Sequence, residues 1–186
     1  YVCVIFMICA SLPFVRYVQL VNGNQFALFK DVQIKTFVAI VFILASVTTL
    51  VIYKKIGLEA ETAFRKALFN ITSIISGTGY SSADYGQWGG FLITMFFFIG
   101  LIGGCAGSTA CSVKIFRYQL VYASVSAQLK QIRSPNGVFI PRYDGRAIDN
   151  DVLSSVMSFF TFFMVTLGIV AILLALTGLD LSLIHI

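Results

Sequence analysis

Residues 61–82, ETAFRKALFNITSIISGTGYSS, lie between two apolar stretches and decide the fold. The first part, 61–75, is half apolar and half polar, and it is too short and too charged at its start to cross a membrane alone. It leads into SGTGYSS at 76–82, which consists of turn-forming and small residues. A short helix that enters the membrane and turns back has this composition. A surface amphipathic helix followed by an ordinary loop has it too, so the segment by itself leaves both interpretations open.

The composition of the whole chain indicates a membrane protein. Of its 186 residues, 58% are hydrophobic and 11% are charged, and the mean hydropathy is +0.90. A soluble domain carries about 25% charged residues. The apolar residues are also gathered in long blocks rather than spaced at the period of a half-buried helix or strand. We therefore expect an all-α protein that crosses the membrane several times and is surrounded by lipid.

Four apolar blocks are expected to form helices. They are residues 1–20, which contain Pro13 and Arg16, then 36–55, then 90–123 with a Gly-rich break at 103–112, and finally 152–178. Residues 61–88 form the turning segment between the second and third blocks. Residues 124–151 form a cytoplasmic connector with a hairpin expected around Asp144 and Gly145. The hexapeptide LSLIHI at 181–186 is expected to be a sequencing or cloning scar on an incomplete reading frame.

Basic residues flank the apolar blocks, so the formal net charge of +5 reflects membrane topology and predicts no nucleic-acid partner. One side of the membrane collects Arg16, Lys30, Lys35, Lys114, Arg117, Lys130, Arg133, Arg142 and Arg146, and the other keeps Lys54, Lys55, Arg65 and Lys66. The positive-inside rule places the first side in the cytoplasm. The turning segment then opens to the outside. Because the four cysteines lie in apolar stretches without a CxxC pair, we expect small buried thiols.

A helix that turns back at Gly and Thr residues suits cation passage. An ion crossing a bilayer exchanges its water shell for equally polar groups, and backbone carbonyls supply them without fixed charge. Gly77 and Gly79 permit the backbone angles that such a strand needs. Thr78 can add a hydroxyl. The preceding helix would direct the negative end of its dipole toward the cation.

Two motifs resemble the Trk/Ktr family of potassium-uptake proteins. ALFNITSIISGTGYS at 67–81 is similar to the family's third pore loop, whose pattern is approximately ALFNxxSxxTTTGF. The second motif, FIG at 98–100 followed by GGCAGSTA at 103–110, resembles the family's FIGGCxGSTAGGIKVIR. Residues 152–153 and 176–180 match the first helix of the family's fourth repeat. The resemblance covers most of the chain.

The resemblance implies a fragment of a four-repeat pore, each repeat being helix, pore loop and helix as in K⁺ channels. It implies a K⁺ filter formed by Ser76, Gly77, Thr78 and Gly79, with the ion at Gly77, Thr78 and Gly79. The break would be an intramembrane gate loop formed by Gly103, Gly104, Cys105, Ala106, Gly107, Ser108, Thr109 and Ala110. Lys114 and Arg117 would be basic residues at the inner mouth, although plain anchors on the inner side are the preferred interpretation of the pair. Without the resemblance, a close-packed Gly/Ala/Ser helix interface is the preferred interpretation of the break.

The chain departs from the family pattern at both motifs. Ser76 and Gly77 stand where Thr-Thr is usual, and Tyr80 stands for Phe. Cys111 and Ser112 replace Gly-Gly, which removes two flexible positions from the expected gate loop.

The resemblance further implies a homodimer in the inner membrane of a prokaryote and a cytosolic nucleotide-binding regulatory subunit. It implies no cofactor in this chain, with K⁺ as the transported ion. Transport of another monovalent cation is the alternative within the same superfamily. An intramembrane hydrolase that uses Ser108 lacks a base within the spans. A purely structural membrane protein leaves the Gly/Thr turn unexplained. We therefore expect no enzyme.

Overall fold

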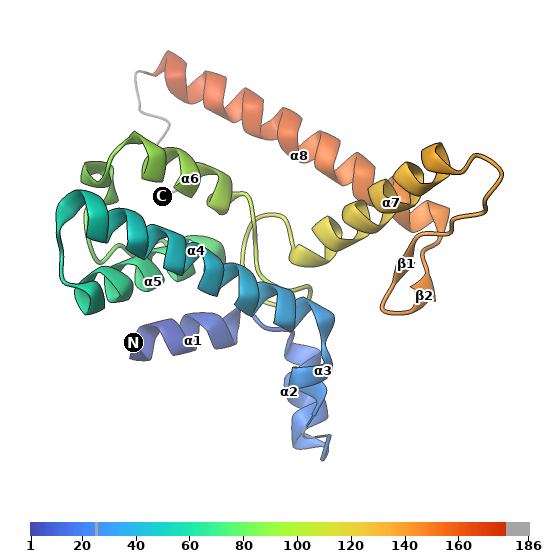
Figure 1. Cartoon of the computed structure of the whole chain (residues 1–186), viewed down its shortest axis with the longest axis horizontal. Coiled ribbons are helices and arrows are strands. Elements are labelled where there is room, and N and C mark those ends of the chain that lie inside the picture. Colours follow the sequence, from blue (N-terminus) through green and yellow to red (C-terminus); the bar gives the residue numbers. More distant parts are fainter. Residues whose placement is uncertain (25, 178–186) are drawn as a thin grey trace. The chain divides into compact units, whose positions relative to one another are not determined.

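The computed structural model describes residues 1–24 and 26–177, which are mostly helical (Figure 1). The helices are α1 (Val2–Ala10), α2 (Phe14–Val21), α3 (Ala27–Lys30), α4 (Val32–Ile56), α5 (Ala60–Ser76), the 3₁₀ helix η1 (Tyr85–Trp88), α6 (Gly90–Gly100), α7 (Ile115–Arg133) and α8 (Asn150–Leu176). The strands are β1 (Arg142–Tyr143) and β2 (Arg146–Ala147). The chain divides into two compact units, Tyr1–Ile115 and a second that begins at Phe116, and each is described by itself.

Helix α4 is long and apolar enough to cross a membrane. Its 25 residues make a helix about 37 Å long, against about 30 Å for the hydrocarbon core. It begins before the expected residue 36 because Asp31 caps it: one carboxylate oxygen of Asp31 accepts the backbone N–H of Gln33 at 2.7 Å. The helix ends at Gly57, which has a left-handed φ of +71°.

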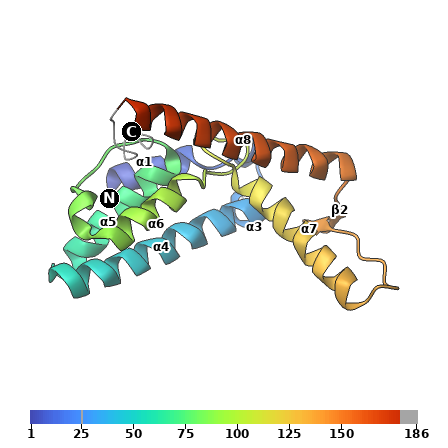
Figure 2. The same ribbon diagram turned by 90° about the horizontal axis from the view of Figure 1, so that it is seen from above.

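Helix α5 is the centre of the first unit. It contacts α1, α4 and α6, and both ribbon views show it among them (Figures 1 and 2). The core side chains come from one stripe on each of α4, α5 and α6: Phe37, Val41, Ala45 and Ile52; Ala63, Ala67, Ile71 and Ile75; and Leu92, Phe96 and Ile99. Small residues at 45, 63 and 67 are fully buried, so the backbones of α4 and α5 can approach closely.

The last turns of α5 are enclosed on all sides. Asn70, Ile71, Thr72 and Ser73 are consecutive in the sequence and each is at most 1% exposed. A surface amphipathic helix keeps one face in water, so four successive buried positions contradict that interpretation. The end of α5 is therefore packed inside the first unit, and its turning back within a membrane stays a prediction.

Residues 1–20 form two helices instead of the single expected one. Helices α1 and α2 are bent by 96° at residues 11–13. Pro13 precedes α2 and has no N–H to continue the ladder of α1, and its fixed φ suits the start of the new helix. The hydroxyl of Ser11 donates to the Met7 carbonyl at 2.9 Å, which satisfies one acceptor at the end of α1.

The block expected at 90–123 has different limits. Helix α6 ends at Gly100 and α7 begins at Ile115, so the break covers 101–114 and is longer than the expected 103–112. Helix α7 then continues to Arg133, into the stretch expected to be a connector. Leu, Gln and Lys are good helix formers, and Pro135 is the first residue after 123 that stops the helix.

The second unit contains the predicted hairpin and a long apolar helix. Strands β1 and β2 pair in antiparallel register around Asp144 and Gly145, both of which have positive φ, so this prediction is confirmed. Tyr143 on β1 donates its hydroxyl to Gln119 on α7 at 3.1 Å. Helix α8 has 27 residues and is long and apolar enough to cross a membrane. The expected scar at 181–186 lies outside the described residues.

The cysteines correct one expectation. All four are free thiols, but only Cys105 is buried in the structure, whereas Cys3, Cys9 and Cys111 are exposed. Cys105 is enclosed by the core of the first unit. Cys3 and Cys9 lie on α1, whose two buried side chains are Val4 and Met7, so both thiols point away from the core. An apolar stretch of sequence does not say which of its faces is covered.

Candidate functional site

The turn after α5 has a defined geometry. Gly77 ends the helix with a φ of +73°, a conformation that side-chain-bearing residues rarely adopt. The N–H of Gly77 donates to the Ile74 carbonyl at 3.1 Å, and the N–H of Thr78 donates to the Ser73 carbonyl at 3.0 Å. These two bonds make a Schellman motif, which stops α5 and turns the chain away from its axis.

The four predicted filter residues lie together in this turn. Gly79 also has a left-handed φ, of +79°, and the hydroxyls of Ser76 and Thr78 lie 2.7 Å apart. Residues 77–80 are exposed although the end of α5 just before them is buried. The turn therefore presents backbone polar groups to open space at the carbonyl end of a buried helix. The partial negative charge at that end favours a cation.

Asn70 holds the segment that follows the turn. Its side-chain oxygen accepts the backbone N–H of Ser82 at 3.0 Å, and its amide nitrogen donates to the carbonyl of Lys66 at 2.9 Å. The amide nitrogen also lies 3.3 Å from the hydroxyl of Ser82. Asn70 is 1% exposed, so these are its main polar partners in the fold. Sequence reasoning did not single out this residue, although an Asn inside a helix is a signal of a specific polar contact.

The predicted gate loop is closed at its neck by backbone hydrogen bonds. The N–H of Gly103 donates to the carbonyl of Val113 at 2.8 Å, and the N–H of Val113 donates to the carbonyl of Leu101 at 3.2 Å. Gly103 leaves no room for a side chain, because a Cβ there would overlap the carbonyl oxygen of Cys111. Residues 101–114 therefore form a closed loop with paired ends rather than an open linker.

The loop and the break between α1 and α2 satisfy each other's backbone groups. The N–H of Cys105 donates to the carbonyl of Ser11 at 3.0 Å, and the hydroxyl of Thr109 donates to the carbonyl of Ala10 at 3.1 Å. In return, the N–H of Phe14 donates to the carbonyl of Gly107 at 3.0 Å. Non-helical backbone at membrane depth needs such partners, since lipid supplies none. Two irregular segments far apart in the sequence thus stabilise one another.

Side chains add two further anchors to the loop. The side-chain oxygen of Gln33, in the first turn of α4, accepts the N–H of Ala106 at 2.9 Å. The ammonium of Lys114 donates to the carbonyls of Ser108, at 3.1 Å, and of Ala110. Lys114 therefore binds the loop's own carbonyls in this structure, in addition to any role at the inner mouth.

The predicted basic pair is divided between the two units. Arg117 belongs to the second unit, where its guanidinium lies 3.8 Å from the ring centroid of Phe159 on α8. This is a cation–π contact within that unit. Lys114 belongs to the first unit and contacts the gate loop.

Ser108 does not have the surroundings of a nucleophile. Its hydroxyl donates to the carbonyl of Cys105 at 2.6 Å. The ammonium of Lys114 lies 3.4 Å from that hydroxyl and donates to the carbonyls of Ser108 and Ala110, so it is hydrogen-bonded to the loop backbone. Within residues 1–24 and 26–177, no group of three or more His, Cys, Asp or Glu side chains could hold a metal ion.

The structure also brings the two predicted motifs together. A Cβ built on Gly77 of the predicted filter turn (residues 76–79) would lie 2.9 Å from both Cβ and Sγ of Cys111, just beyond the predicted gate loop. The turn and the loop are therefore in contact. No sequence feature indicated this.

Comparison with known proteins identifies the family. Residues 6–186 match the family model TrkH, described as a cation transport protein. The chain is 35% identical over 177 residues to the Trk system potassium uptake protein TrkI of Halomonas elongata, covering 95% of this chain and 36% of that protein. It is 25% identical to the Trk system potassium uptake protein TrkH of Escherichia coli strain K12, covering 95% of this chain and 37% of that protein.

A solved structure is similar in fold as well as in sequence. The crystal structure of the potassium transporter TrkH from Vibrio parahaemolyticus superimposes with a TM-score of 0.87 at 27% identity, covering 95% of this chain and 39% of that one. The chain thus spans a little over a third of the length of these relatives. The family match and the agreement of folds together show that the chain belongs to the TrkH family of cation transport proteins.

Proposed function

We propose that this chain contributes one complete pore-loop repeat to a potassium pathway across the membrane. In this proposal, the backbone carbonyls of Ser76, Gly77, Thr78 and Gly79 replace part of the water shell of K⁺. Residues 103–110 form a loop beneath them that gates the pathway. The family is one of transporters and not of enzymes.

The turn at the end of α5 carries the proposal. Its residues 77–80 are exposed, its two glycines have left-handed φ, and the helix before it is buried with its carbonyl end at the turn. Packing alone requires no exposed polar turn at the end of a buried helix. The choice of K⁺ as the ion follows from the relatives, which are named potassium uptake proteins.

The complete assembly is proposed from the family. We expect four such repeats around one filter, as the relatives are much longer than this chain. A homodimer in the inner membrane of a prokaryote and a cytosolic nucleotide-binding regulator belong to the same proposal.

The test is a substitution at the filter. We expect Gly79→Asp, in the full-length protein that carries this segment, to abolish K⁺ uptake or its discrimination against Na⁺ in bacteria that lack other K⁺ uptake. Aspartate adds a side chain where φ is +79° and a fixed charge beside the ion. Uptake of K⁺ and Na⁺ is measured together with the amount of protein in the membrane.

Gly57→Asp is the matched control. Gly57 also has a left-handed φ, of +71°, with open space around it, but it ends α4 at a distance from the filter turn in sequence. The Gly57→Asp variant should retain K⁺ uptake and its discrimination against Na⁺. If Gly79→Asp is inserted normally and transports K⁺ with unchanged discrimination, Gly79 is not a filter residue. If the wild-type protein prefers Na⁺, the other monovalent cation is the substrate.

A further inference from the structure

Gly77 and Cys111 lie so close together that there is room for a side chain at only one of the two positions. The Cβ position of Gly77 points at Cys111, lying 2.9 Å from its Cβ and Sγ and 3.3 Å from its backbone nitrogen. Atoms of real side chains do not approach a Cβ so closely, so a side chain at 77 requires Cys111 to move. Gly77 is therefore needed for its lack of a side chain as well as for its φ of +73°.

The backbone contacts of Cys111 prevent it from moving away from Gly77. Its carbonyl oxygen lies against Gly103 on the opposite strand of the loop neck. The next residue, Ser112, has a φ of +62° and donates its hydroxyl to the carbonyl of Gly100 at 2.6 Å. Because the backbone is held on both sides, Cys111 shifts only if the neck of the loop shifts with it.

We propose that Cys111 is a positioning residue that couples the intramembrane loop to the filter turn. Its side chain fills the space beside Gly77 while the loop is in the position seen here, and it supports the turn from which the filter carbonyls follow. A displaced loop removes that support and leaves the turn free to change. This inference rests on the proposed function, since it assigns the coupling to an ion pathway.

Two of the departures from the family pattern, at Gly77 and Cys111, concern this contact. The pattern has Thr at the position of Gly77 and Gly at the position of Cys111, whereas this chain has a side chain at 111 and none at 77. The two positions are far apart in the sequence but in contact in the fold.

The experiment is a double-mutant cycle on Gly77→Ala and Cys111→Gly in the full-length protein. We expect Gly77→Ala alone to lower the maximal rate of K⁺ uptake, and the ratio of K⁺ to Na⁺ uptake, by about tenfold or more through its clash with Cys111. Cys111→Gly alone should raise the uptake rate and lower the ratio, because the turn loses its support. The double variant should recover part of the rate lost in Gly77→Ala, as expected for two positions in contact, and stay below Cys111→Gly alone because alanine at 77 keeps the strain of a φ of +73°.

Gly79→Ala is the matched control for backbone strain. Gly79 has nearly the same φ as Gly77, but a Cβ on it would meet nothing within 4 Å. Its loss of uptake therefore comes from strain and from the filter itself, and Cys111→Gly should not rescue it. The thermal midpoint of each purified variant in detergent gives a second cycle that does not depend on transport.

Coupling in both cycles, with no rescue of Gly79→Ala, supports the proposal. Additive effects of Gly77→Ala and Cys111→Gly on uptake and selectivity overturn it, even if the thermal midpoints show coupling, since the contact would then be structural only. Equal rescue of Gly79→Ala also overturns it, because the rescue would be nonspecific. The proposed function is judged separately, by whether the wild-type protein takes up K⁺ at all.

Discussion

Asn70 is the residue whose side chain joins helix α5 to the segment that follows the turn at 77–80. Replacing it with Leu keeps the approximate size but leaves the N–H of Ser82 without its acceptor. Loss of a hydrogen bond of this kind costs about 0.5–1.5 kcal/mol. We expect Asn70→Leu to lower the thermal midpoint in detergent and to reduce discrimination between K⁺ and Na⁺.

Ser82→Ala is the control for Asn70. It removes only the longer contact of 3.3 Å to the Ser82 hydroxyl and keeps the backbone hydrogen bond. It should therefore have the smaller effect on both measurements. If the two variants behave alike, the backbone hydrogen bond is not what orders this segment.

Ser112 occupies a conformation that favours glycine. Its φ of +62° costs a side-chain-bearing residue about 1–2 kcal/mol, and its hydroxyl offsets part of this by donating to Gly100 at 2.6 Å. Ser112→Ala should lower the thermal midpoint, because it loses the bond and keeps the strain. Ser112→Gly should be nearly neutral and should raise the uptake rate by loosening the loop. An alanine variant as stable as the wild type would mean that the hydroxyl contributes nothing.

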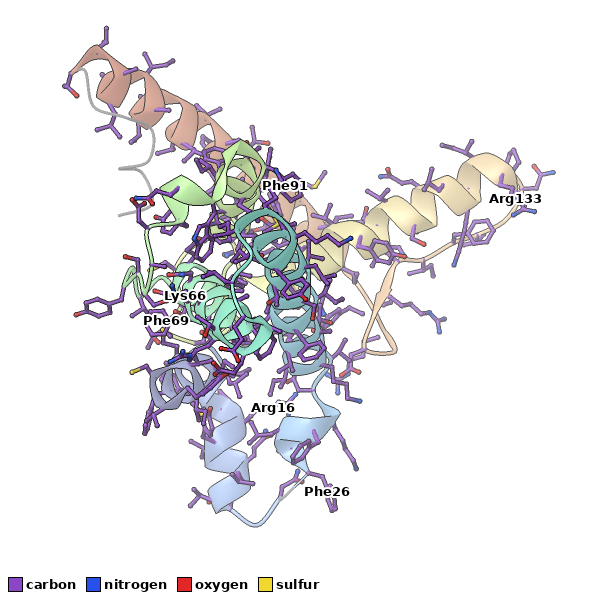
Figure 3. All side chains as sticks on the ribbon, turned by 60° about the vertical axis from the view of Figure 1, so that its left-hand side comes forward. Arg16, Phe26, Lys66, Phe69, Phe91 and Arg133 are labelled. Carbon is purple, nitrogen blue, oxygen red and sulfur yellow. The ribbon has the colours of Figure 1, made fainter. Side chains whose placement is uncertain are left out.

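At the scale of elements, the start of α4 joins several segments. Asp31 caps the helix and also forms an ion pair with Arg16 of α2 at 2.6 Å; Arg16 extends from α2 toward α3 (Figure 3). Two residues into α4, Gln33 accepts the N–H of Ala106 in the loop 101–114. One helix terminus thus holds the bend after α1 and this loop in place.

Substitutions at Asp31 separate its two roles. Asp31→Asn can keep an oxygen for the N–H of Gln33 and loses only the charge, whereas Asp31→Ala loses the cap as well. Loss of an N-cap costs about 1 kcal/mol, so the alanine variant should be the less stable of the two by about that amount. Thermal unfolding in detergent measures both. Equal midpoints for the two variants would show that the cap adds nothing to the ion pair.

At the scale of the whole molecule, the distribution of basic residues predicts the orientation in the membrane. The loop between α4 and α5 should face outside, and the β1–β2 hairpin should face the cytoplasm. Glu59→Cys and Arg146→Cys place one thiol in each, in a background where Cys3, Cys9 and Cys111 are serine. A membrane-impermeant maleimide should label residue 59 in intact cells and residue 146 only in inverted vesicles. The opposite pattern would reverse the orientation.

Local sequence patterns were sufficient to predict the long helices and the hairpin. Long uncharged blocks predicted α4 and α8, because only a helix satisfies its own backbone within lipid. The dipeptide Asp144–Gly145 predicted the hairpin because both residues tolerate positive φ. The limits of the helices were less predictable. Helix α4 starts early because of a capping contact, and α7 runs on through polar residues that composition had assigned to a connector.

The sequence by itself determined a helical membrane protein, its family motifs and a Gly/Thr turn at the end of a short helix. It did not determine whether that helix was buried, because a half-polar helix can pack against protein or lie in water. Only the tertiary structure enclosed α5, joined the break after α1 to the loop at 101–114, and placed Cys111 against Gly77. The physical reason is that composition and spacing act over a few residues, whereas these contacts join backbone and side chains from distant parts of the chain.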